Sequence, residues 1–150
     1  MKKNAAVIHH IKKMVENNPQ DFWGCDSEKV RLFLDVDEDP NLILKILEAN
    51  PNKFLSIVRL ILLDKHLDSQ YKIEKSPVTA MKFIGTPNSR IYCLDECPKG
   101  QKRRVVMAHG LWNKNEQKND KEINQIIDNI KETEYTYYQS WQEYEKTQQS

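Results

Sequence analysis

The stretch VVMAHGLWNKNEQKNDKEI, residues 105–123, joins a buried strand to the start of a helix. Its first part belongs to KRRVVMAHG, residues 102–110, whose unbroken apolar centre is typical of a strand covered on both faces. Asn119 stands three residues before Glu122, which is the capping-box arrangement at the beginning of a helix. The sequence therefore predicts a buried strand that ends in His109-Gly110, an exposed turn, and a helix that begins after Asn119.

Apolar and aromatic side chains extend this helix toward the C-terminus at helical spacing. They are Ile123, Ile126, Ile127, Ile130, Tyr137, Tyr138, Trp141 and Tyr144. Because side chains three and four residues apart share one face of a helix, the pattern predicts a single long helix over 120–146. Its aromatic end, in residues 135–150, could pack on the body of the domain or form a surface for a partner or a second copy.

Two further helices are predicted to form a hairpin in the first half of the chain. Asp39-Pro40 is a helix-start signal, and residues 40–49 carry apolar side chains on one face. Asn50-Pro51-Asn52 interrupts this pattern, and Asn52 is expected to cap a second, broadly apolar helix over about 53–68. Two helices joined by so short a break form a helical hairpin.

Two segments that precede this hairpin are less regular. Residues 4–17 alternate apolar and basic side chains at helical spacing, which predicts an amphipathic helix. Residues 29–36, KVRLFLDV, alternate apolar and charged side chains, but Phe33 interrupts the alternation. This second segment fits either an edge strand or the start of a helix.

The middle of the chain indicates a small sheet. Pro77 and Pro87 exclude a helix in this region, and the apolar residues of 81–84 predict a short strand there. RIYCLDEC, residues 90–97, is predicted to be a second strand, with Ile91 and Cys93 on one face and Tyr92 and Leu94 on the other. The loop PKGQ then connects it, as a hairpin, to the buried strand 102–110.

These elements predict one α+β domain over residues 1–150, with a small antiparallel β-sheet packed on an N-terminal helical hairpin and a long C-terminal helix. No apolar run is long enough to span a membrane and no secretory signal opens the chain, so we expect a cytoplasmic protein. The three cysteines form no disulfide framework. Cys93 and Cys97 lack the second ligand pair of a zinc site, and we predict no metal and no other cofactor.

The net charge of +1 conceals a strongly basic middle segment. Residues 71–115 contain nine lysines and arginines against three acidic residues. This asymmetry fits a local anion-binding surface, and it equally fits a charge mixture that keeps the chain in solution. Cations with interleaved aromatic rings suit RNA, because they neutralise phosphates and stack on unpaired bases. The predicted RNA-binding residues are Lys82, Lys102, Arg103, Arg104, Trp112 and Lys118.

The same segment holds the groups that RNA cleavage by 2′-hydroxyl attack requires. A base must take the hydroxyl proton, cations must stabilise the charged phosphate, and an acid must protonate the leaving oxygen. Arg90 could hold the phosphate together with Arg103 or Arg104, and His109 could serve as base or acid. The predicted catalytic residues are Arg90, Tyr92, His109 and Lys114.

Each of these residues also has a structural interpretation. A histidine at the end of a strand is more often structural than catalytic, and Tyr92 on a sheet fits the core. Because side chains alternate along a strand, Arg103 and Arg104 should face opposite sides of the sheet. At most one of them is therefore expected to join a site with Arg90.

The stretch from His109 to Ile123 resembles, without gaps, the end of toxins of the RelE/HigB/ParE superfamily, above all the HigB-like members. In those toxins an apolar strand ends in His-Gly-Phe, a Lys-Lys-Thr-Gln-Lys-Thr-Pro loop follows, and a helix begins with Lys-Glu-Ile. The resemblance covers about residues 38–134, and its specific part is 104–123. Residues 1–28 and 135–150 are extensions beyond the resemblance.

The resemblance implies the toxin of a bacterial or phage type II toxin–antitoxin system, usually an mRNA interferase. Such an endoribonuclease cleaves mRNA on the ribosome, needs no metal and is neutralised by an antitoxin protein. Arg90, His109 and Lys114 match basic residues of the family's pattern. Asn113 and Gln117 stand where the family has lysines.

Two other interpretations of the sequence remain open. One is a catalytically inactive protein of the RelE fold that binds a partner, or a second copy of itself, through the aromatic C-terminal helix. The other is a ParE-like toxin that inhibits gyrase, because one fold hosts both activities.

Overall fold

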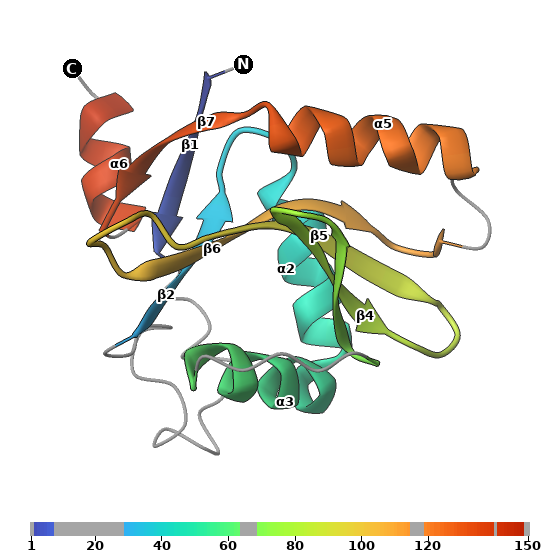
Figure 1. Ribbon diagram of the computed structural model, residues 1–150. Coiled ribbons are helices and arrows are strands. Elements are labelled where there is room, and N and C mark those ends of the chain that lie inside the picture. The colour runs from blue at the N-terminus through green and yellow to red at the C-terminus, as the bar shows by residue number, and fades with distance from the viewer. Residues whose placement is uncertain (1, 8–28, 64–68, 115–118, 140, 149–150) are drawn as a thin grey trace.

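The structure is a computed structural model that describes residues 2–7, 29–63, 69–114, 119–139 and 141–148 (Figure 1). The strands of these residues form one sheet of seven, in the order β3-β4-β5-β6-β2-β1-β7. The elements along the chain are β1 (Lys2–Val7), β2 (Val30–Asp35), α2 (Pro40–Ala49), α3 (Pro51–Leu62), β3 (Tyr71–Lys75), β4 (Val78–Phe83), β5 (Ser89–Glu96), β6 (Arg103–Leu111), α5 (Asp120–Lys131), β7 (Glu134–Tyr138) and α6 (Trp141–Gln148).

The sheet is mixed. Strands β3 to β6 are antiparallel, whereas β6 pairs with β2, and β1 pairs with β7, in the parallel direction. The segment 29–36, which fitted a helix start or an edge strand, is thus the inner strand β2, with β6 on one side and β1 on the other. Phe33 fits this strand, because a strand covered on both faces buries apolar side chains on both sides of the sheet. Leu32 and Leu34 are buried on one side, and Phe33 is buried on the other.

Strand β6 is buried on both faces, as its unbroken apolar centre predicted. Helices α2 and α3 lie on one side of the sheet and α5 lies on the other (Figure 1). Val105 and Met107 belong to the core on the side of α2 and α3, whereas Val106 and Ala108 belong to the core on the side of α5. All four side chains are at most 2% exposed. Since burying a valine or methionine side chain contributes about 1.5–3 kcal/mol, β6 anchors both layers of helices.

The predicted helix starts are confirmed in two places. Asp39 caps α2, and its carboxylate accepts a hydrogen bond from the Leu42 backbone N–H at 3.1 Å. Asn119 caps α5 by accepting from the Glu122 N–H at 2.9 Å. The second hairpin helix differs slightly, because α3 already begins at Pro51, whose fixed backbone angle suits the first helical turn.

The prediction of an N-terminal amphipathic helix over 4–17 is wrong where the structure describes it. Residues 2–7 form strand β1, and residues 8–17 lie outside the described residues. Ala5, Ala6 and Val7 are all buried, which a strand covered on both sides achieves and one face of a helix does not. Pairing with β2 and β7 overrides the helical spacing of the sequence.

The predicted long helix over 120–146 is also wrong. Helix α5 ends at Lys131, and strand β7 and helix α6 follow. The Thr133 hydroxyl donates to the Asn129 carbonyl at 2.7 Å, and residues 134–138, EYTYY, are rich in the aromatic and β-branched residues that favour strands. This run pairs in register with β1, which has no other partner on that edge. The aromatic helical surface expected for a second copy is therefore absent over residues 134–138.

The predicted fold class is contradicted as a whole. The described chain combines short helices with a large mixed sheet, rather than a small antiparallel sheet with one long C-terminal helix. The sequence pattern missed β1, β3 and β7. Strand β3 is missed because only Tyr71 at its start is buried, so it shows no apolar alternation. Among the described helices, none is long and apolar enough to cross a membrane.

Gly110 lies where α2 approaches β6 most closely. A Cβ added at this position would meet Ile46 Cδ1 at 3.0 Å and Ile43 Cγ1 at 3.3 Å. Both isoleucines are fully buried and cannot move into solvent. The glycine after His109 is thus required for the packing of the helical hairpin on the sheet.

We predict that Gly110→Ala lowers the free energy of unfolding by about 1–3 kcal/mol, because it overpacks this contact. Ile46→Val removes the closest atom, Cδ1, and costs about 0.5–1.5 kcal/mol by itself. In a double-mutant cycle measured by urea denaturation, the two changes together should cost less than their sum. Additive costs would show that the Gly110–Ile46 contact is not the reason for the glycine.

Candidate functional site

Basic side chains gather on one face of strands β3, β4 and β5, the face that α5 covers further along. Lys82 lies directly opposite Arg90 in the strand register, and Lys72 lies opposite Ala80, two residues before Lys82. Cross-strand partners share a face of the sheet. Burial lowers the pKa of Lys82, and the charges of Lys72, Arg90 and Lys114 lower it further. We call Lys72, Lys82, Arg90 and Lys114 the cationic face.

Arg90 is held rigidly at the base of the cationic face. Only 7% of the residue is exposed, and its Nη1 donates to Asn88 Oδ1 at 2.6 Å and to the Ser89 carbonyl at 3.0 Å. Its Nε is buried and has no hydrogen-bond partner in the part of the chain that the structure describes. The Lys114 backbone N–H donates to the Asn88 carbonyl at 2.9 Å, so the segment after β6 is tied to the Arg90 strand.

Glu74 is a member of this site that the sequence did not reveal. Its Oε1 lies 3.8 Å from Lys82 Nζ, and its charge also acts on Arg90 and Tyr92. Glu74 carries no sequence signal, because β3 shows no apolar alternation and its register is set by pairing with β4. Glu74 thus places a carboxylate close to Lys82 and Arg90 of the cationic face.

Tyr92 lies on the same face but under the surface. It is 2% exposed and belongs to the core beneath α5. Burial and the neighbouring charge of Glu74 raise the pKa of Tyr92 to about 12, against the smaller effect of Arg90. Its phenol therefore stays protonated at neutral pH and supports the site from below.

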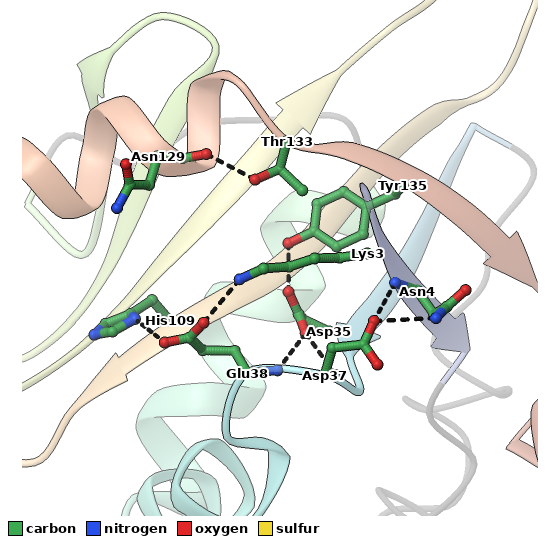
Figure 2. A network of polar contacts seen from close by, with 9 residues as sticks. All are labelled: Lys3, Asn4, Asp35, Asp37, Glu38, His109, Asn129, Thr133 and Tyr135. Atoms are coloured by element: carbon green, nitrogen blue, oxygen red, sulfur yellow. Dashed lines mark hydrogen bonds and ion pairs between the residues drawn. The ribbon is translucent and has the colours of Figure 1, made fainter. Parts of the chain in front are cut away.

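His109 is opposite Tyr92 in the sheet, but its ring is directed to a different group of polar residues (Figure 2). Its Nδ1 lies 3.2 Å from Glu38 Oε1, and Glu38 Oε2 accepts a hydrogen bond from Lys3 Nζ at 2.7 Å. These three side chains and residues of α5 line a pocket of about 220 Å³. His109 of β6 thus lies next to residues of β1 and α5, and Glu38 orients its ring.

The same polar group ties strand β7 to the sheet. The Tyr135 hydroxyl donates to Asp35 Oδ2 at 2.6 Å, and Asp35 Oδ1 accepts from the backbone N–H groups of Asp37 and Glu38 at 2.8 Å each (Figure 2). Asp35 is completely buried. Burial raises the pKa of Asp35, and the hydrogen bonds from Tyr135 and the two backbone groups oppose this shift.

The remaining predicted RNA-binding residues are not part of the cationic face. Arg103 is buried on the hairpin side and makes two bonds to Asp95, from Nε at 2.8 Å and from Nη2 at 2.5 Å. Trp112 packs against the core under the hairpin, with Lys45 Nζ 4.4 Å from its ring centre. Lys102 and Arg104 line a separate pocket, and Lys118 lies outside the described residues.

The predicted site is therefore divided. The structure brings Lys82, Arg90, Tyr92 and Lys114 close together, whereas His109 belongs to the polar group around Glu38. Among the described residues, no group of three or more histidine, cysteine, aspartate or glutamate side chains could hold a metal ion. Comparison of the chain with models of known families, with curated proteins and with solved structures found no match.

We predict that Tyr135→Phe lowers the free energy of unfolding by about 1–3 kcal/mol, because it leaves one oxygen of the buried Asp35 without its hydrogen bond. Tyr138→Phe is the matched control, since it removes a hydroxyl of the same strand for which the described residues show no hydrogen bond. Urea denaturation of both variants measures the difference. Equal, small losses would contradict a role for the Tyr135–Asp35 bond in holding β7.

A second prediction concerns the acid dependence of stability. The hydrogen bond from Lys3 is the main cause that lowers the pKa of Glu38. A carboxyl whose pKa is lowered on folding stabilises the fold above its ordinary pKa, and this contribution is lost as the pH falls through the folded-state pKa. Glu38→Gln should therefore be less stable than the wild type at pH 7, and the difference should shrink in acid.

Denaturation midpoints measured between pH 7 and pH 3 test this prediction. Glu48→Gln, an exposed change on α2, serves as the control and should show a small difference that does not vary with pH. A difference for Glu38→Gln that stays constant, or grows in acid, would contradict the coupling of Glu38 to Lys3.

Proposed function

We propose that this chain is the toxin of a type II toxin–antitoxin system, which cleaves mRNA on the ribosome in the cytoplasm and is neutralised by an antitoxin. The observation that carries the proposal is the cationic face, in which the charges of Lys72, Arg90 and Lys114 act on Lys82 and the Glu74 carboxylate lies 3.8 Å from Lys82 Nζ. The order of elements also supports it, because a helical hairpin precedes the strands of this face and the His109-Gly110 strand end leads into α5, as the resemblance implies.

The cationic face suits a phosphodiester. Lys82 and Lys114 are only partly buried, so both ammonium groups can approach a phosphate, while Arg90 supplies fixed positive charge beneath them. Such preorganised cations stabilise the additional negative charge that develops on a phosphate under attack. Because these cations would contact phosphates and not bases, we expect the face to bind RNA without sequence preference.

The proposed reaction needs one proton acceptor and one proton donor. The 2′-oxygen forms a bond to the adjacent phosphorus and gives its proton to the Glu74 carboxylate. The bond from phosphorus to the 5′-oxygen breaks, and the Lys82 ammonium protonates that leaving oxygen, which gives a 2′,3′-cyclic phosphate and a free 5′-hydroxyl. The lowered pKa of Lys82 makes its ammonium a better acid at neutral pH.

His109 and Tyr92 have supporting roles in this proposal. Tyr92 packs beneath the face with its hydroxyl protonated. His109 is held by Glu38 and connects the end of β6 to the polar group at β1. Neither residue carries a proton-transfer step, which separates this proposal from the catalytic set predicted from the sequence.

We predict that Glu74→Gln and Lys82→Gln each reduce mRNA cleavage by about 10²- to 10⁴-fold, the range for loss of a general acid or base. Arg90→Gln should abolish cleavage as well, because it removes the phosphate-stabilising charge. Cleavage is measured by primer extension on a reporter mRNA in a reconstituted translation reaction, and growth arrest on induced expression is the second readout. Lys99→Gln, an exposed change in the loop after β5, is the charge-matched control and should behave as the wild type.

Three outcomes would contradict this function. Full cleavage by folded Glu74→Gln and Lys82→Gln would show that the chemistry lies elsewhere. Binding of RNA by the wild type without cleavage would identify the inactive interaction protein instead. Growth arrest with intact mRNA and loss of DNA supercoiling activity would identify a gyrase inhibitor.

A further inference from the structure

A second basic site lies at the other end of β6. Arg31 on β2 and Arg104 on β6 are direct partners in the parallel register. They line a pocket of about 340 Å³ together with Lys102, Tyr137 and Gln139. The pocket is lined by residues of β2, of β6 and the loop before it, and of the C-terminal part of the chain, because β7 pairs with β1 at the edge of the sheet and supplies Tyr137, which Gln139 follows.

Small side chains on β1 make this pocket possible. Ala5 lies between Asp35 on β2 and Tyr137 on β7 in the register. Because alanine is short, the Tyr137 ring reaches across β1 and contacts Phe33 edge-on, with ring centres 4.8 Å apart. These two rings form an apolar wall beside the arginines.

The guanidinium of Arg104 is held in a fixed orientation. Its Cζ lies 4.1 Å from the centre of the Tyr137 ring, a stacking geometry that attracts a cation to an aromatic face. Its Nη1 donates to Gln101 Oε1 at 3.4 Å. The Arg31 guanidinium is likewise held, since its Nη1 donates to Gln139 Oε1. Two planar guanidiniums on adjacent strands are thus preorganised on one face.

The side chains that line the pocket carry a net positive charge. In addition, one N–H group of Arg104 has no acceptor among the described residues. Lys102 adds a third cation to the lining, and Glu96, opposite Arg104 in the register, is the carboxylate that acts on Tyr137. The Nε of Arg104 is buried without a hydrogen-bond partner among the described residues. A buried donor left unsatisfied destabilises the folded state, and an anion in the pocket would supply acceptors to both guanidiniums.

We propose that this pocket binds the phosphate group of a ligand of about mononucleotide size, with Arg31 and Arg104 as the phosphate-binding pair. Arginine forks match the oxygens of phosphate in two-point contacts. The pocket volume leaves room beside the phosphate for a sugar or a base against the wall of Phe33 and Tyr137. The site is separate from the cationic face, so it does not depend on the proposed RNA cleavage.

Isothermal titration calorimetry on the full chain tests this proposal, with inorganic phosphate and adenosine 5′-monophosphate as probes. The wild type is expected to bind both saturably at one site. Arg104→Gln and Arg31→Gln should each weaken binding at least tenfold, about 1.4 kcal/mol. Lys121→Gln, an exposed change on α5, should leave the affinity unchanged. Circular dichroism establishes that each variant is folded. If Arg104→Gln does not fold, the affinity of Arg31→Gln decides the test.

A short RNA with hydroxyl groups at both ends then distinguishes the source of the phosphate. If this RNA displaces adenosine 5′-monophosphate, the pocket accepts the phosphodiester of a strand, and if it does not, the pocket requires a free monoester. Two results would overturn the proposal: no saturable binding of either probe by the wild type, or equal affinity in the wild type and in the folded arginine variants. Loss of probe binding in Arg90→Gln would also overturn it, because the probes would then bind at the cationic face.

Discussion

The burial of β6 on both faces is the constraint on which the rest of the structure depends. Val105 and Met107 support α2 and α3, whereas Val106 and Ala108 support α5. Because the strand has no solvent side, its ends are where polar side chains reach a surface. Gly110 allows α2 to approach one end closely, and the same end leads into the segment of Lys114 next to Arg90.

This double burial also separates the basic residues of the strand. Alternation along β6 sends Arg103 to the hairpin side, where Asp95 binds it and the Tyr71 hydroxyl donates to Asp95 at 2.6 Å. It sends Arg104 to the other side, under the Tyr137 ring. A contiguous run of charge in the sequence thus becomes a buried ion pair on one face and an anion pocket on the other, so neither arginine belongs to the cationic face.

The additions at the two ends of the chain give the molecule its other polar sites. Strand β1 extends the sheet beyond β2, and β7 pairs with β1. Because β7 lies in the sheet beside β1, Tyr135 reaches Asp35, and Tyr137 reaches Phe33 across the short Ala5 side chain. The pocket at His109 and the pocket at Arg104 therefore both depend on the long-range pairing of β1 with β7.

The sequence by itself determined the local features that depend on neighbouring residues. Asp39 and Asn119 cap helices because a side-chain oxygen needs only an N–H group three residues away, and the apolar run of β6 required cover on both faces. Only the tertiary structure decided that residues 4–7 and 134–138 are strands, because each is the other's pairing partner across more than a hundred residues. It also decided which charges meet: Glu74 joins Lys82 and Arg90 through strand register, and His109 turns to Glu38. Register and pairing are settled by contacts distant in sequence, which helical spacing and local charge do not encode.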